Sequence, residues 1–66
     1  MNAAQQRALD LLRDLGGSAK TMHLVLGHSI YRATLQALER RGLTRTEWDG
    51  TEHRTVLVEQ EEVGRL

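Results

Sequence analysis

The chain has 66 residues, with nine Lys or Arg, nine Asp or Glu and no cysteine. A chain of this length forms one small domain, because it hides only about 60% of the surface that its unfolded form exposes. Without cysteine it has no disulfide framework and no thiolate zinc site, which is typical of a reducing cytosol. No segment resembles a signal peptide or is long enough to cross a bilayer, so we expect a cytoplasmic protein with no membrane partner.

The charges are unevenly distributed along the chain. Residues 18–45 contain five cations and one anion, hence a net charge of +4, whereas residues 46–66 contain two cations and six anions, hence −4. Formal neutrality of the whole argues against a protein that holds nucleic acid by bulk charge alone. The asymmetry predicts a molecule with two electrostatically different sides.

Residues 2–15 have the periodicity of an amphipathic helix. The apolar side chains that recur at helical spacing are Ala4, Ala8, Leu11, Leu12 and Leu15. Asn2 is a candidate N-cap, and Gly16-Gly17 ends the helix because glycine accepts the left-handed backbone found there. We expect this helix to be scaffold.

Residues 18–27 predict a second, short helix that is capped by Ser18 and ended by Gly27. The residues that share its apolar face are Met22, Val25 and Leu26. Its polar and β-branched residues give it a modest propensity, so its stability depends on packing against the next helix. The two helices are joined by a glycine-containing turn of two to four residues, the local pattern of a helix-turn-helix.

Residues 29–41 predict the helix around which the other elements are organised. It begins at a cap on His28 or Ser29, and Gly42 lies just past its end. The side expected to face the core carries Tyr31, Leu35 and Leu38. The opposite side carries Ser29, Arg32, Ala33, Gln36 and Arg40, a small polar and cationic surface that a DNA groove could accept.

After Leu43 the sequence becomes rich in β-branched residues and predicts a β-hairpin around the turn at residues 49–52. A four-residue loop pairs Trp48 with His53 and Glu47 with Arg54. A two-residue loop would instead oppose Glu47 to Glu52, and because opposed like charges cost energy we favour the longer loop. In that register the face that covers the helices carries Leu43, Val56 and Val58, and the outer face carries Thr44, Thr46, Trp48 and Leu57.

Three helices followed by a hairpin, in this order and at these lengths, resemble the winged helix-turn-helix domain. The chain is similar to bacterial transcriptional regulators of the MarR and GntR kinds in the residues Ser29, Tyr31, Arg32, Leu35, Leu38, Glu39, Gly42 and Leu43. The resemblance implies a mainly α fold with a small β-hairpin, with a winged helix-turn-helix domain over residues 1–58. Residues 59–66 are acidic and too few to bury a core, so we expect a frayed tail there. It also implies that the start of the third helix enters the major groove, with Ser29 and Arg32 at positions that contact DNA.

An α-helix fits the major groove, and arginine makes a bidentate pair with guanine O6 and N7. The candidate base-reading residues are Ser29, Arg32, Ala33 and Gln36. The candidate phosphate contacts are Lys20, His28, Arg40, Arg41, Arg45 and Arg54. The alternative for either set is a solvated charged surface that serves solubility.

Nothing in the sequence indicates catalysis. There is no Ser-His-Asp grouping, phosphate loop or convergent pair of buried carboxylates, so we do not expect an enzyme. The spacing of His23, His28 and His53 matches no common ligand pattern, and we expect neither a metal nor a cofactor.

The sequence therefore predicts a small winged-helix transcriptional regulator that binds duplex DNA sequence-specifically, with residues 29–41 in the major groove. Because specific affinity usually needs two half-sites, we expect a weak homodimer or paired binding on DNA. The alternative is a winged-helix protein-protein interaction module that acts on a polymerase or another regulator. Its partner would bind through Trp48 and the acidic hairpin, since tryptophan is enriched at interface hot spots.

Overall fold

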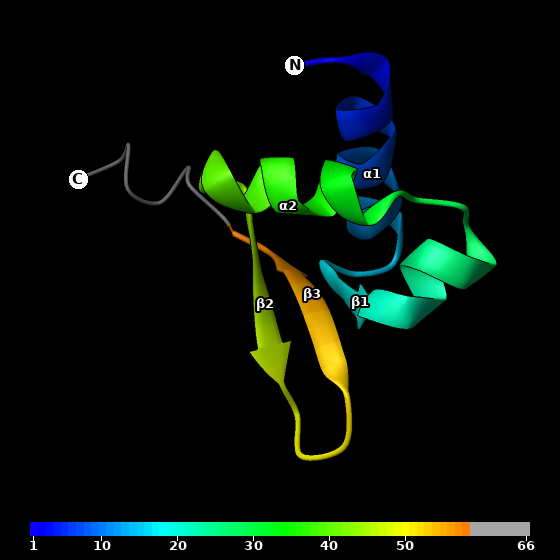
Figure 1. Ribbon diagram of the computed structural model, residues 1–66, viewed down its shortest axis with the longest axis vertical. Coiled ribbons are helices and arrows are strands. Elements are labelled where there is room, and N and C mark those ends of the chain that lie inside the picture. The colour runs from blue at the N-terminus through cyan, green and yellow to red at the C-terminus, as the bar shows by residue number, and fades with distance from the viewer. Residues whose placement is uncertain (59–66) are drawn as a thin grey trace.

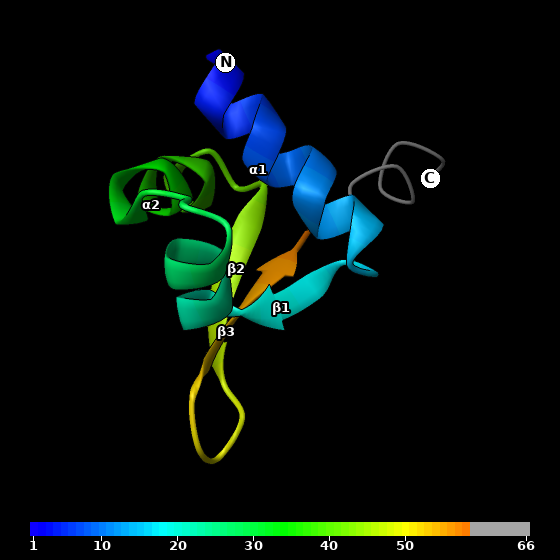
Figure 2. The same cartoon turned by 90° about the vertical axis from the view of Figure 1, so that its right-hand side faces the viewer.

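The computed structural model describes residues 1–58, which form three helical segments and one three-stranded antiparallel sheet (Figure 1). The elements in chain order are α1 (Ala3–Asp14), β1 (Ser18–Lys20), η1 (His23–Gly27), α2 (Arg32–Arg40), β2 (Thr44–Trp48) and β3 (His53–Leu57). In the sheet the strand order is β1-β3-β2. The loop end of the β2–β3 hairpin projects beyond the helices (Figures 1 and 2). The predicted tail, residues 59–66, lies outside the described residues.

The two ends of α1 are as predicted. Asn2 is the N-cap, and its side-chain oxygen accepts a hydrogen bond of 2.8 Å from the amide of Gln5. At the other end Gly16 and Gly17 have φ values of 88° and 93°, and the Gly17 amide donates to the Leu12 carbonyl over 2.7 Å. This bond satisfies a carbonyl of the last turn, which explains why the helix ends abruptly.

The buried stripe of α1 is displaced from the prediction. Ala8, Leu9 and Leu12 are buried, whereas Ala4 and Leu15 are exposed. The helix packs on α2, β3 and β1 through its middle turns, so its two ends extend past the core. Helical periodicity predicts which side of α1 is apolar, but not how much of the length of the helix the packed elements cover.

The segment predicted as a second helix divides into a strand and a shorter helical turn. Ser18–Lys20 pairs with β3, with Ala19 opposite Thr55, and only His23–Gly27 forms the π-helical turn η1. The predicted apolar face is wrong in two of its three members, since Met22 and Leu26 are exposed and Leu24 is buried instead. A three-residue strand is too short to show a periodicity in the sequence. Ser18–Lys20 is a strand because it pairs with β3. The third strand makes the fold a mixed α/β arrangement.

The start of the organising helix is also corrected. α2 begins at Arg32, and its N-cap is Tyr31, whose side chain makes no capping hydrogen bond. Ser29, which we expected to begin the helix, has φ 59° and therefore lies in a left-handed turn. Tyr31 is 75% exposed, not buried, and the neighbouring Ile30 takes the core position.

The end of α2 is as predicted, and so are two of the three predicted members of its inner face. Leu35 and Leu38 are buried, and the side chain of Leu38 is completely inaccessible. Gly42 has φ 77°, and the Leu43 amide donates to the Leu38 carbonyl over 3.0 Å.

The hairpin has the predicted register, with Trp48 opposite His53 and Glu47 opposite Arg54. Its faces are the reverse of the prediction apart from Leu43, which packs on the core as expected. The side chains that turn inward include those of Thr44, Thr55 and Leu57, whereas Val56 takes the opposite face because it is adjacent to Thr55 and Leu57 in the strand. A buried threonine is acceptable here because the Thr55 hydroxyl is hydrogen-bonded to that of Thr21 over 2.9 Å.

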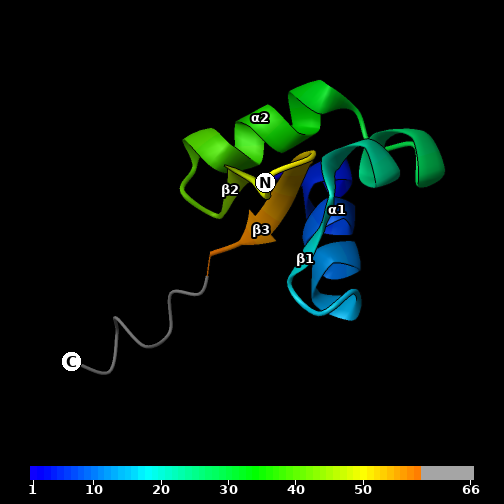
Figure 3. The ribbon, with the colours of Figure 1, turned by 90° about the horizontal axis from the view of Figure 1, so that it is seen from below.

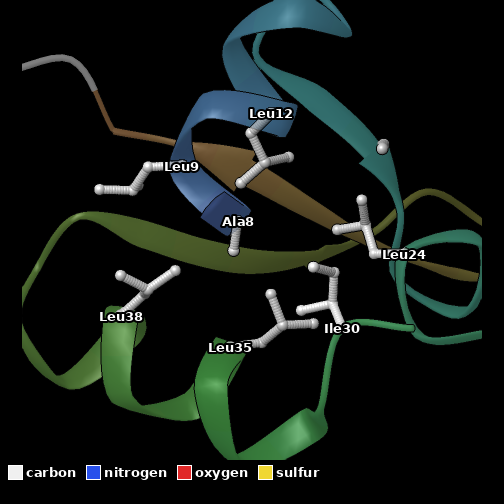
Figure 4. Close-up of a cluster of buried hydrophobic side chains, with 8 residues drawn as sticks. Ala8, Leu9, Leu12, Leu24, Ile30, Leu35 and Leu38 are labelled. Carbon is white, nitrogen blue, oxygen red and sulfur yellow. The ribbon is translucent and has the colours of Figure 1, made fainter. Parts of the chain in front are cut away.

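One cluster of leucines, with Ile30 and two alanines, joins the elements (Figure 4). Its buried members are Ala8, Leu9, Leu12, Ala19, Leu24, Ile30, Leu35 and Leu38. The cluster lies between α1, α2 and the sheet, so the outer side of α2 remains free for other contacts. Within residues 1–58 no helix is long and apolar enough to span a membrane.

Candidate nucleic-acid interface

The outer side of α2 carries three of the four residues predicted to read bases, together with one predicted phosphate contact. The exposed members are Arg32, Ala33, Gln36 and Arg40. They lie opposite Leu35 and Leu38, which anchor the helix in the core. The guanidinium of Arg32 lies 3.3 Å from the sulfur of Met22, a weak acceptor that leaves most of its donors available. Since an α-helix fits the major groove, this exposed side of α2 is the candidate surface for base contacts.

Ser29 is separated from these residues by the helix boundary. It is exposed, but it lies in the turn between η1 and α2, three residues before Arg32. The structure therefore brings four residues of the predicted face together on one helix and places Ser29 beside its start. As Ser29 is not the N-cap, its hydroxyl does not occupy the capping position that we expected for it.

The turn before α2 is held by two contacts that sequence reasoning missed. The Ile30 amide donates to the Leu24 carbonyl over 3.0 Å, while its side chain enters the core. The Arg7 guanidinium on α1 donates to the His28 carbonyl over 2.7 Å. Arg7 is 21 residues away in sequence, so nothing local indicates this role. Together the contacts tie η1, the turn and α1 into one support for α2.

Two of the predicted phosphate contacts are already ion-paired. Lys20 lies 3.2 Å from a carboxylate oxygen of Glu52, and Arg45 lies 2.6 Å from one of Glu47. Both pairs are largely exposed to solvent, so each stabilises the fold by at most about 1 kcal/mol. They nevertheless neutralise positive charge that the sheet would offer to a phosphate.

The other predicted phosphate contacts differ in their availability. The half-buried Arg54 donates from Nε to the hydroxyl of Ser18 over 3.1 Å. His28 is half-buried, with its ring edge-on to that of His23. Arg40 and Arg41 are exposed at the end of α2, and neither forms an ion pair within residues 1–58. Within the described residues, three of the cations without a carboxylate partner, Arg32, Arg40 and Arg41, therefore lie on α2 or at its C-cap.

A groove of about 450 Å³ separates α2 from the inner face of the hairpin. α2 contributes Arg32, Leu35, Gln36 and Glu39 to its wall; the other lining residues are Thr21, Met22, Thr44, Thr46, Trp48, Thr51, Glu52, His53 and Thr55. Trp48 is 62% exposed, and its ring centroid lies 5.1 Å from that of His53. The view from the loop end of the hairpin shows α2 beside the sheet (Figure 3). The groove was not predicted, because it depends on the position of the hairpin relative to α2, which the sequence does not give.

The hairpin loop is stabilised by a carboxylate. Asp49 accepts hydrogen bonds from the amides of Thr51 and Glu52, each over 2.9 Å, and from the Thr51 hydroxyl over 3.0 Å. These bonds, above all that of the Thr51 amide, lower the pKa of Asp49 below its ordinary value of 3.8. Asp49 therefore serves the turn, although it also keeps a negative charge at the loop.

Comparison with models of known families, with characterised proteins and with solved structures gave no match to this chain. The geometry described above is therefore the basis for any functional conclusion.

Proposed function

We propose that the chain is a small cytoplasmic transcriptional regulator that binds duplex DNA through α2, on a winged helix-turn-helix fold. One observation carries the proposal: α2 is anchored by Leu35 and Leu38 and presents Arg32, Gln36 and Arg40 on its exposed side. Arginine and glutamine are the side chains that pair bidentately with guanine and adenine in the major groove.

The order of the elements supports the same fold. A helical segment, a four-residue connection and a second helix precede a hairpin, which is the sequence of parts expected of a helix followed by a wing. The buried Ile30 and the Arg7–His28 contact hold the connection, so α2 has a defined direction relative to the hairpin. A rigid mount is what base reading requires, because a bidentate contact tolerates little displacement.

The distribution of charge sets the expected strength of binding. Arg40 and Arg41 are available to phosphates, whereas Lys20 on β1 and Arg45 on β2 are paired with glutamates. Each phosphate contact contributes about 0.9 to the slope of log affinity against log salt. We therefore expect a shallow dependence on salt, with a slope of about 2 to 3, and specificity that depends on a few residues of α2.

The test is an NMR titration of labelled protein with a pool of random duplex DNA, at low and then moderate salt, followed by selection of a site. We expect salt-sensitive shifts over residues 29–41. On the selected site, Arg32→Ala should weaken binding by about 1 to 3 kcal/mol.

Arg13→Ala is the matched control, because Arg13 is an exposed arginine on α1 that pairs with Asp10. Its affinity should stay close to that of the unmodified chain. An absence of shifts in residues 29–41 at low salt, or equal losses for the two variants, contradicts DNA binding through α2.

A second candidate function is a protein-protein interaction module that acts on a polymerase or another regulator. The groove favours it, because its wall contains the exposed Trp48 and the carboxylate of Glu39, which would repel a phosphate backbone. Under this function Arg32→Ala leaves DNA affinity unchanged, while Trp48→Ala abolishes capture of the partner.

A further inference from the structure

The outer edge of the sheet at β2 has no neighbouring strand within residues 1–58. The strand order β1-β3-β2 places β3 in the middle, so β2 pairs on one side only. Figure 1 shows β2 as the outer strand of the hairpin. An unpaired edge presents backbone donors and acceptors to any strand that approaches it.

The hydrogen-bond pattern identifies the residues whose backbone groups point outward. The Val58 amide donates to Leu43 over 2.9 Å, and the Asp49 amide donates to Glu52 over 3.1 Å. Residues in an antiparallel strand alternate between bonding to one side and to the other. The amides and carbonyls at 43, 45, 47 and 49 therefore point toward β3, and those at 44, 46 and 48 point to the free edge.

We infer that this edge pairs with the β2 edge of a second copy of the same chain, antiparallel and centred on Thr46. The sequence of β2 is self-complementary about that residue, since Arg45 precedes it and Glu47 follows it. In this register Arg45 of each copy lies opposite Glu47 of the other, on the face of the sheet away from the groove. Oppositely charged cross-strand neighbours stabilise an antiparallel pair.

Charge also excludes the neighbouring registers. A pair centred on Glu47 opposes the two Glu47 carboxylates, and a pair centred on Trp48 opposes Glu47 to Asp49. Like charges directly opposite each other are destabilising. Of these three registers, the Thr46-centred one places opposite charges together on both sides of the two-fold axis without opposing any like charges.

The accessible part of the edge suits this arrangement. Arg45, Thr46, Glu47 and Trp48 are exposed, whereas Thr44 is buried and limits the ladder at its end. The existing Arg45–Glu47 pair within one chain is at the surface, so exchanging it for the equivalent pair between two chains costs little. The central contact is then two backbone hydrogen bonds at Thr46, flanked by two ion pairs.

The interface is small, and the dimer is therefore weak. A stable protein-protein interface buries about 1,200 to 2,000 Å² in total, more than a five-residue strand supplies. We expect a dissociation constant of roughly 100 μM to 1 mM, with monomer and dimer in rapid exchange. The inference does not depend on DNA binding, because the association is measured with the protein alone.

The test is sedimentation equilibrium of the full chain without DNA, up to about 1 mM. The wild type should dimerise. Arg45→Glu alone and Glu47→Arg alone should each stay monomeric, because each opposes like charges, and an equimolar mixture of the two variants should associate. Each variant also loses the Arg45–Glu47 ion pair within its own chain, and mixing the two variants does not restore that pair. Association of the mixture therefore shows that the two residues pair between copies and do not only stabilise their own chain.

Thr46→Pro gives an independent readout. Its amide makes no bond to β3, so proline removes a donor from the free edge and leaves the hairpin ladder intact. The variant should fold, as judged by circular dichroism, and remain monomeric. A wild-type chain that is monomeric at 1 mM overturns the inference and leaves the edge to a strand of another protein. A dimer that persists in Thr46→Pro, or single variants that dimerise as the wild type does, overturns it in favour of another surface.

Discussion

α2 and the hairpin lie side by side but are held by different forces. α2 is anchored by completely or nearly buried leucines, and its charged side chains remain available at the surface. Apart from Leu57, which packs on the core, the hairpin is held by polar contacts. These are backbone pairing, the Thr21–Thr55 hydroxyl contact and ion pairs that use its charged residues Arg45, Glu47 and Glu52. The difference teaches that apolar anchoring frees the charged residues of an element for a partner, whereas polar anchoring consumes them.

The largest expected effect is the loss of the apolar anchor of α2. Leu38→Ala removes a completely buried side chain and should destabilise the fold by about 2 to 5 kcal/mol. That is much of the stability of so small a domain, so a substantial unfolded population should appear in urea titrations near zero denaturant.

Gln36→Ala, on the exposed side of the same helix, is the control and should change stability by less than about 0.5 kcal/mol. Equal effects for the two variants would mean that α2 is not anchored by one face.

A smaller effect is expected from the polar anchor of the hairpin. Thr55→Val removes one partner of the 2.9 Å hydroxyl contact with Thr21 and should cost about 1 kcal/mol in the free energy of unfolding. A double-mutant cycle tests the contact: thermal denaturation is measured for Thr21→Val, for Thr55→Val and for the variant that carries both changes. The double variant should cost less than the two single losses added together, and strict additivity would argue against the hydrogen bond.

The smallest effect is local to the loop. The pKa of Asp49 is lowered in the folded chain. The carboxylate therefore stabilises the fold fully above pH 3.8, and this contribution is lost as the pH falls through the lower pKa of the folded state. The amide resonances of Thr51 and Glu52 should shift in acid as the Asp49 carboxylate is protonated, and most of that shift should be absent in Asp49→Asn. Asp49→Asn is the control, and a loop that titrates at or above 3.8 would contradict the contact.

Local sequence determined both ends of α1, the C-terminal end of α2 and the hairpin register. Asn2, Gly16-Gly17 and Gly42 act through backbone geometry within a few residues, so a reader of the sequence can locate them. The opposition of Glu47 to Glu52 likewise excludes one register by Coulomb repulsion between neighbours. The exposed face of α2 follows from helical periodicity, and four of its five predicted members lie on that helix.

Tertiary structure alone decided β1, the inward face of the hairpin and the turn before α2. Ser18–Lys20 becomes a strand because β3 lies beside it, and Thr55 faces inward because Thr21 satisfies its hydroxyl. Arg7 supports the turn from α1, and the groove beside α2 depends on the angle of the hairpin. Each is a contact between residues far apart in the chain, whose free energy no local pattern of side chains contains.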